Sequence, residues 1–209
     1  MANLRKQLVA LIDNPQAFLN HDSPELRRLA VSHLAGTTSI DDVDTFCEML
    51  VNDPDARVRS EAAESIGLSG LDRTESLLAA LDDTDETVVE AVVTGLGELE
   101  DERSVPSLID LAYTGSTKMI REAAVAALGA VGHADALPVL MDLVVSGPPQ
   151  VRRRCVVALT VFDGDEVEAA LRAAAKDNNP MVREAAEMVV GRPAPQWEPI
   201  DISPSSENS

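Results

Sequence analysis

The sequence predicts an all-α fold, a right-handed α-α superhelix in which about six helical hairpins stack in a line. A ten-residue block recurs six times with starts 30 to 32 residues apart, apolar residues inside each block follow the helical period, and turn-forming residues separate the predicted helices. Recurrence at this spacing is typical of solenoids, in which each unit hides its apolar face only against its neighbours. The blocks start at Leu26, Val58, Val88, Ile120, Val151 and Val182.

The recurring blocks are predicted to be the second helices of the hairpins. Their first, fifth and ninth residues are apolar, and offsets of four place these residues on one buried stripe. The fifth residue is Ala, Val or Cys in every block, which lets neighbouring helices come close. Glycine follows the stripe in four blocks, where we expect it to end the helix in a left-handed conformation, at Gly67, Gly97, Gly129 and Gly191.

A second apolar pattern upstream of each block predicts the first helix of the hairpin. Its apolar residues lie three apart on one helical face, and turn clusters rich in Asp, Ser, Thr and Pro open the helix that follows. In the first hairpin the expected helix covers residues 3–12, and Asn14 and Pro15 break it. The predicted repeats are residues 1–36, 37–70, 71–100, 101–133, 134–164 and 165–191.

The blocks carry a motif of the form VRxxAAxxLG, as in VRSEAAESIG at Val58 and IREAAVAALG at Ile120. This motif resembles the HEAT-repeat superfamily and, within it, the HEAT-like repeats of phycobilisome lyases. The resemblance covers residues 4–191 and implies a superhelix of helical hairpins. It leaves the function open, because similar repeats serve in scaffolds, chaperones, lyases and a few enzymes.

The composition is strongly acidic, with 36 Asp and Glu against 17 Lys and Arg and a formal net charge of −19. Because dense surface carboxylates hold water and counterions, and molar salt screens their repulsion, this predicts a halophilic protein; an ordinary acidic protein is the alternative. The charge argues against nucleic acid as a partner, since phosphate binding needs a basic surface. No stretch reaches the roughly 18 apolar residues of a membrane span, so we expect no membrane partner and a cytoplasmic location.

The sequence offers no catalytic, cofactor-binding or metal-binding residues. Cys47 and Cys155 occupy apolar repeat positions and are predicted to pack as small hydrophobic residues. His21, His33 and His133 form none of the paired motifs of metal sites, including the His-Glu pairs with which deoxyhypusine hydroxylase, a HEAT-like enzyme, binds iron. Nucleophile-elbow, phosphate-binding and dinucleotide-binding motifs do not occur either, so we expect no enzyme and no cofactor.

One position of the block is arginine in five of the six repeats, namely Arg27, Arg59, Arg121, Arg152 and Arg183. Six residues before this position, three of the turns contain an aspartate, namely Asp53, Asp83 and Asp177. We predict a structural ladder in which each arginine bonds turn carboxylates or carbonyls of the adjacent repeat, because the planar guanidinium makes several directed bonds.

Three further arginines, Arg28, Arg153 and Arg154, are not needed by the ladder. Because second helices of such solenoids line the concave surface, we expect these side chains to form a cationic spot for an acidic partner segment. The only tryptophan, Trp197, lies in a Pro- and Ser-rich tail over residues 192–209, which cannot continue the helix. It is expected either to fold back over the last repeat or to dock on a partner.

The favoured function is a non-enzymatic scaffold or adaptor that holds an extended segment or a helix of a partner protein on its concave face. The alternative is a lyase, or a lyase-like chaperone, acting on a cofactor-bearing client protein. A large apolar pocket in the concavity would favour the alternative, and a charged groove would favour the adaptor.

Overall fold

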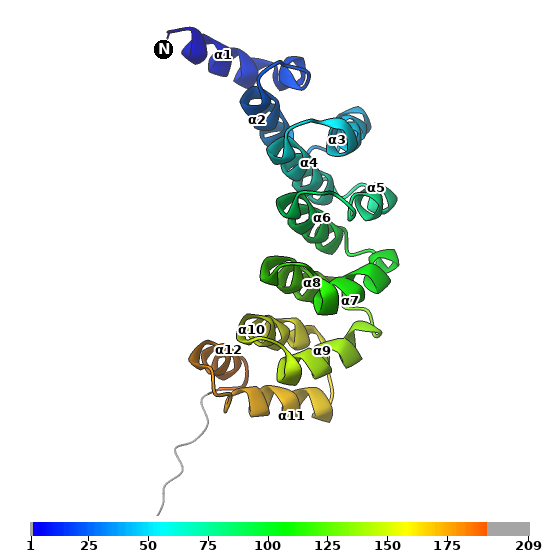
Figure 1. Cartoon of the computed structure of the whole chain (residues 1–209), viewed down its shortest axis with the longest axis vertical. Coiled ribbons are helices and arrows are strands. Elements are labelled where there is room, and N and C mark those ends of the chain that lie inside the picture. Colours follow the sequence, from blue (N-terminus) through cyan, green and yellow to red (C-terminus); the bar gives the residue numbers. More distant parts are fainter. Residues whose placement is uncertain (1, 192–209) are drawn as a thin grey trace, which may run out of the picture.

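The computed structural model describes residues 2–191, and over this part of the chain the predicted all-α fold is confirmed. Within residues 2–191, twelve α-helices pair in chain order into six hairpins, which stack in a curved row (Figure 1). The first helices of the hairpins are α1 (Ala2–Asp13), α3 (Ile40–Asn52), α5 (Thr74–Ala79), α7 (Val105–Thr114), α9 (Ala136–Ser146) and α11 (Asp165–Ala174). The second helices are α2 (Pro24–Leu34), α4 (Ala56–Leu68), α6 (Glu86–Leu99), α8 (Lys118–Val131), α10 (Pro149–Ala158) and α12 (Pro180–Val190). Three short 3-10 helices also occur, at η1 (Pro15–Phe18), η2 (Glu102–Ser104) and η3 (Leu159–Val161).

Short polar side chains in the turns begin most of the second helices. The Asp55 carboxylate accepts a hydrogen bond from the backbone N–H of Arg57 at 3.0 Å, and Asp85 does the same for Thr87 at 2.9 Å. These bonds satisfy N–H groups that the first turn of a helix leaves without a partner. The turn residues therefore fix the start of four of the six second helices within residues 2–191, α4, α6, α8 and α12.

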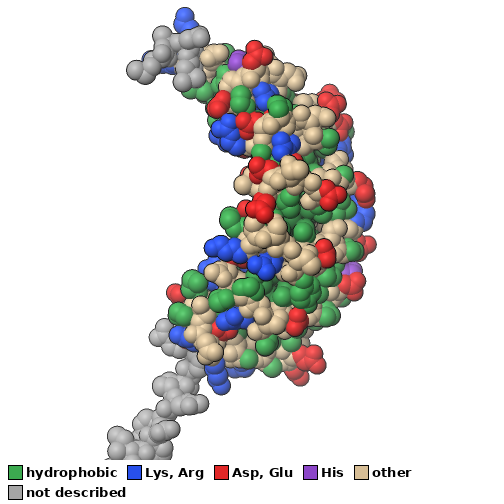
Figure 2. Space-filling model, viewed as in Figure 1, with side chains coloured by type: hydrophobic (Ala, Val, Ile, Leu, Met, Phe, Trp, Pro, Cys, Tyr) green, Lys and Arg blue, Asp and Glu red, His purple; other side chains and the backbone are tan. Residues whose placement is uncertain are grey.

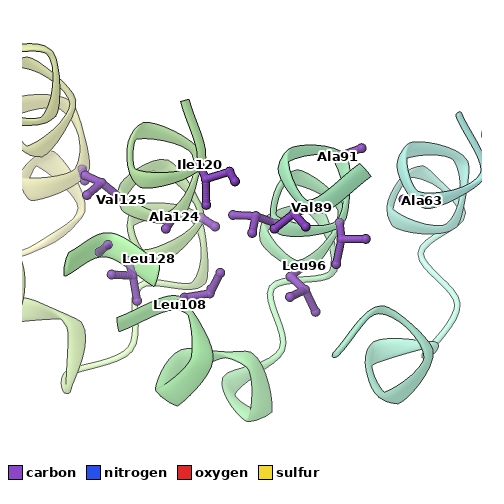
Figure 3. Close-up of a cluster of buried hydrophobic side chains, with 14 of the residues drawn as sticks. Ala63, Val89, Ala91, Leu96, Leu108, Ile120, Ala124, Val125 and Leu128 are labelled. Atoms are coloured by element: carbon purple, nitrogen blue, oxygen red, sulfur yellow. The ribbon is translucent and has the colours of Figure 1, made fainter. Parts of the chain in front are cut away.

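The second helices form the inner row of the stack and pack directly on one another, α2 on α4, α4 on α6 and so on to α12. The predicted apolar stripe is confirmed, because its fifth-position residues are all fully buried, namely Ala30, Ala62, Val92, Ala124, Cys155 and Ala186. Figure 3 shows Leu96 of α6, Leu108 of α7 and Leu128 of α8 in the same cluster. The core thus runs along the stack, and each hairpin completes the core of the next.

The role predicted for the glycines after the stripe is wrong in three of the four cases. Gly67, Gly97 and Gly129 lie inside α4, α6 and α8 and keep helical backbone angles. A Cβ atom on Gly97 would lie 2.9 Å from the Cα of Ala127 in α8, closer than real Cβ contacts come. Glycine occurs here because successive second helices touch backbone to backbone, not because the helix ends.

The left-handed residues lie beyond these contact points. Gly132 has a φ of +64° at the end of α8, and Glu100 has a φ of +51° at the end of α6. Gly191 follows α12 with a φ of +80°, as predicted for that position. No helix within residues 2–191 combines the length and the apolar character that crossing a membrane would require.

Candidate partner-binding face

The concave side of the stack is a groove lined by second helices, and the space-filling view shows the hollow (Figure 2). A cavity of about 560 Å³ lies over α2, α4 and α6, and one of about 360 Å³ lies over α6, α8 and α10. Glu90 and Thr94 of α6 line both cavities. The two cavities therefore adjoin along the concave face, and we call them together the groove.

The lining of the groove is mostly polar or small. The larger cavity is lined by Arg28, Arg57, Ser60, Glu61, Glu64, Thr87, Glu90, Ala91 and Thr94. The smaller cavity adds Gly97, Glu98, Ala123, Ala126, Ala127, Ala130 and Arg154. Sites for small apolar ligands are usually lined by hydrophobic and aromatic side chains, and this lining differs from them.

Carboxylates crowd the N-terminal half of the groove. Burial raises the pKa of Glu64 first, and the negative charges of Glu61 and Glu90 raise it further. Glu61 accepts a hydrogen bond from Nη1 of Arg28 at 2.8 Å, which offsets part of its charge. Arg57, the second arginine of this lining, pairs with Glu25 and Asp55. Glu64 and Glu90 are therefore left without an arginine partner among the described residues of this half.

The predicted partner-binding arginines lie at two separate places. Arg28 belongs to α2 and lines the larger cavity, whereas Arg153 and Arg154 belong to α10. Arg153 is exposed, and Arg154 lines the smaller cavity with its Nε buried and without a hydrogen-bond partner. The structure therefore does not bring the three arginines together into one spot. Trp197 lies outside the described residues.

Three of the column arginines bond the turn aspartate of the following repeat through two guanidinium nitrogens, Nε and Nη2. Nε and Nη2 of Arg59 donate to the Asp83 carboxylate at 2.7 and 2.9 Å, and Nη1 donates to the carbonyl of Asp53 in its own turn at 2.9 Å. These hydrogen bonds hold the pKa of Asp83 below its usual value, although partial burial opposes the shift. The same arrangement joins Arg27 to Asp53 and Arg152 to Asp177.

The ladder is interrupted in the middle of the stack. Val89 occupies the arginine position of the third repeat, and Gly115 occupies the aspartate position of the fourth. The prediction that Arg121 contributes to the ladder is corrected by the structure, because its Nε is buried without a partner and the corresponding turn of the fifth repeat, at Gly147, offers no carboxylate. Arg183 belongs to the last of the hairpins within residues 2–191 and donates to the carbonyl of Asp177 in its own turn at 2.6 Å.

A comparison with protein-family models agrees with this architecture. The model described as HEAT repeats matches residues 12–74 and 74–159, which together span 148 of the 209 residues. The chain belongs to the HEAT-repeat family. No curated protein matches its sequence.

Solved structures that resemble this HEAT-repeat chain share its fold at low sequence identity. The complex of CpcE and CpcF of phycocyanin lyase from Nostoc sp. PCC7120 matches with a TM-score of 0.67 and 23% identity, over 84% of this chain and 74% of that chain. An engineered protein matches with a TM-score of 0.62 and 18% identity, over 87% and 95% of the two chains. The Escherichia coli protein YibA matches with a TM-score of 0.61 and 17% identity, over 83% and 67%. At these identities the likeness is one of fold.

A second set of ion pairs joins the HEAT repeats near the first helices, and sequence reasoning missed it. Nη2 of Arg73 lies 2.7 Å from Oδ1 of Asp44, and Nη2 of Arg103 lies 2.5 Å from Oδ1 of Asp72. In both pairs the arginine reaches back to the preceding repeat, opposite in direction to the ladder on the second helices. The signal was present in the sequence, since an acid followed by arginine recurs 30 residues apart at Asp72-Arg73 and Glu102-Arg103.

The two cysteines and His21 of the HEAT repeats have structural environments. Burial raises the pKa of Cys155 to about 12 and also raises the pKa of Cys47, so both thiols stay protonated near neutral pH. Nδ1 of His21 accepts a hydrogen bond from the backbone N–H of Ser23 at 3.0 Å. Within residues 2–191, no three His, Cys, Asp or Glu side chains group in a way that could hold a metal ion.

Proposed function

We propose that this HEAT-repeat chain is a cytoplasmic, non-enzymatic adaptor that holds an extended or helical segment of a partner protein along its concave groove. The observation that carries the proposal is a groove of two adjoining cavities over five second helices, with an exposed Arg153 and a buried, unpartnered Nε on Arg154 at one end. A buried donor without a partner costs about 1–3 kcal/mol. An acceptor on a bound segment would remove that cost.

The charges along the groove suggest the chemistry of the bound segment. Glu61, Glu64 and Glu90 favour basic residues over α4 and α6, whereas Arg153 and Arg154 favour acidic residues over α10. A segment with basic residues toward one end and acidic residues toward the other would match both halves. Arg28 remains a proposed contact at the N-terminal end, where it also bonds Glu61.

The test is affinity capture from the native lysate at high salt, followed by mass spectrometry, with the wild-type chain and the double variant R153E/R154E. We expect the variant to lose the captured partner, because charge reversal replaces attraction by repulsion at the acidic end of the segment. The measured quantity is the amount of each captured protein relative to the wild type.

The matched control is R172E/K176E, which makes the same charge change at two exposed positions outside the two groove cavities, Arg172 in α11 and Lys176 just after it. We expect this control to capture the partner as well as the wild type does. Equal capture by all three chains would contradict a role for Arg153 and Arg154. Equal loss from both variants would mean that net charge, and not the groove, governs capture.

The alternative function, a lyase or lyase-like chaperone for a cofactor-bearing client, is suggested by the likeness to the phycocyanin lyase complex. The carboxylates, hydroxyls and alanines that line the two cavities favour the adaptor, since a bilin-like cofactor would need an apolar pocket. Purification from the native source distinguishes the two functions. A bilin-type absorbance that accompanies the protein would favour the alternative.

A further inference from the structure

Large exposed apolar side chains are more frequent in the C-terminal half of the concave face than in the N-terminal half, where Leu68 holds the position equivalent to Val161. The C-terminal half exposes large apolar side chains that a soluble surface does not require. Val157 is 52% exposed, Val161 is 57% exposed and Met188 is 78% exposed. Met119 and Met181 are about half exposed as well. We call these five residues the apolar half of the groove.

Repeat positions place these side chains on the concave face. Val157 and Met188 occupy the position that Glu64 and Thr94 hold in earlier repeats, and both of those residues line the groove. Because the second helices are parallel and superimpose by repeat, equivalent positions point to the same side. Val161 is equivalent in the same way to Ala130, which lines the smaller cavity.

The described chain ends beside this patch. Val189 and Val190, the last residues of α12, line a cavity together with Phe162, which directly follows Val161. The described residues therefore end at Gly191, three residues after Met188 of the apolar half of the groove. Six residues separate Gly191 from Trp197, a distance of at most about 20 Å when extended, and packed helices lie about 8–10 Å apart. Trp197 can therefore reach the groove.

The segment and the patch are chemically complementary. Trp197, Ile200 and Ile202 alternate with the acids Glu198 and Asp201. The patch offers apolar side chains beside two arginines on α10, one exposed and one with a buried, unpartnered Nε. Apolar contact and charge attraction thus fall in the same place.

The open end of the last repeat is a less apolar target. In repeats two to five, one position facing the next repeat is apolar and buried, at Ala63, Val93, Val125 and Val156. In the last repeat this position is Glu187.

We propose that residues 192–209 dock on the apolar half of the groove, with Trp197 against Val157, Val161 and Met188 and the acids of the segment near Arg153 and Arg154. The docking itself needs no partner. Its consequence rests on the proposed function, because a docked segment would compete with a partner protein for the C-terminal half of the same groove.

Trp197 is the only tryptophan, so its fluorescence reports on the segment directly in the full chain. We expect an emission maximum at shorter wavelength, and weaker quenching by acrylamide, in the native chain than in the urea-unfolded chain. Met188→Asp and Val157→Asp should shift emission to longer wavelength and increase quenching, because each places a carboxylate under the indole. Circular dichroism checks that the variants remain helical.

The matched control is Leu68→Asp, which changes a residue of similar exposure, 55%, on α4 in the other half of the molecule. We expect no change in emission. Native emission equal to that of the unfolded chain, or equal shifts in all three variants, would overturn the proposal. Emission that depends on protein concentration would overturn it in favour of docking on a second copy.

Partner capture measures whether the docked segment competes with a partner protein for the groove. Trp197→Ala should increase partner capture relative to the wild type, whereas R153E/R154E should decrease it. If fluorescence shows a solvent-exposed Trp197 while R153E/R154E still loses the partner, the docking fails and the adaptor function stands. If Trp197 is shielded and no groove variant changes capture, the adaptor function fails and the docking stands.

Discussion

The carboxylate of Asp83 joins two repeats and shapes a turn with the same two oxygens. It accepts two hydrogen bonds from Arg59 of the preceding repeat, and its Oδ1 also accepts one from the backbone N–H of Asp85 at 2.8 Å. Both side chains of the ion pair are largely buried, with exposures of 14% and 12%. Breaking such a pair leaves a charge without compensation, which costs far more than losing an exposed pair.

Replacing Asp83 by asparagine should lower the free energy of unfolding by about 2–3 kcal/mol, because a charge-assisted bidentate contact is lost inside the stack. Urea unfolding measures this change. Asp82→Asn is the control, since the neighbouring Asp82 is exposed and the charge change is the same.

The pKa of Asp83 is lowered by folding. The stability that Asp83 contributes is therefore present above the unfolded pKa and declines as the pH falls through the folded pKa. A difference between wild type and D83N that stays constant down to strongly acidic pH would contradict the ion pair.

The ionisation of Glu64 affects folding stability in the opposite direction from that of Asp83. Burial and two neighbouring glutamates raise the pKa of Glu64 in the folded chain, so the ionised form disfavours folding. The penalty is absent below the unfolded pKa and grows as the pH rises through the folded pKa. Glu64→Gln should therefore raise the melting temperature at neutral pH and leave it unchanged in strong acid. Glu48→Gln, on an exposed position of α3, should show no such gain; a gain of equal size there would attribute the effect to net charge alone.

At the scale of the helix, the second helices approach so closely that a methyl group cannot fit between them. The Cβ of an alanine at position 97 would meet the backbone of α8, and one at position 95 would lie 2.8 Å from the carbonyl oxygen of Ala63 in α4. The helix gains about 1 kcal/mol of propensity when alanine replaces glycine. The steric conflict opposes this gain, because neither backbone can move without disturbing the whole stack.

Gly97→Ala should therefore lower the free energy of unfolding by about 1–3 kcal/mol, despite the better helix propensity. Chemical denaturation measures the change. Thr94→Ala, on the exposed groove side of the same helix, should leave stability unchanged or raise it slightly. A stabilised G97A chain would show that α6 and α8 are farther apart in solution than in the structure.

At the scale of the whole molecule, an elongated stack spreads a formal charge of −19 over 209 residues. In dilute salt, the Debye length is long enough for neighbouring surface carboxylates to repel one another. Concentrated salt shortens the Debye length and screens this repulsion. The ladder pairs are partly buried and are screened less. Added salt should therefore relieve repulsion across the surface while it leaves the ladder largely intact.

The melting temperature should rise as NaCl is increased from about 0.1 M to about 2 M, because screening removes self-repulsion of the folded state. Differential scanning calorimetry measures the change, and sucrose at matched osmolality serves as the uncharged control. The ion-specific part of the rise is the difference between the two series. A melting temperature that is flat or falls in NaCl would contradict the predicted halophilic character.

The sequence by itself determined the hairpins, their number and their buried stripe. These features depend on contacts that recur every thirty-odd residues. A small apolar residue at the fifth position of a block is therefore expected to be buried in every repeat. The ladder was also predictable where donor and acceptor both recur, as at Arg59 and Asp83.

Only the tertiary structure decided how neighbouring repeats meet. It placed Gly97 against Ala127 instead of at a helix end, left Arg121 without a carboxylate, and separated Arg28 from Arg153 along the groove. The physical reason is that these properties depend on the distance and direction between consecutive hairpins. The sequence pattern along one helix predicts which face of that helix is buried. It does not predict the distance from that helix to the next one.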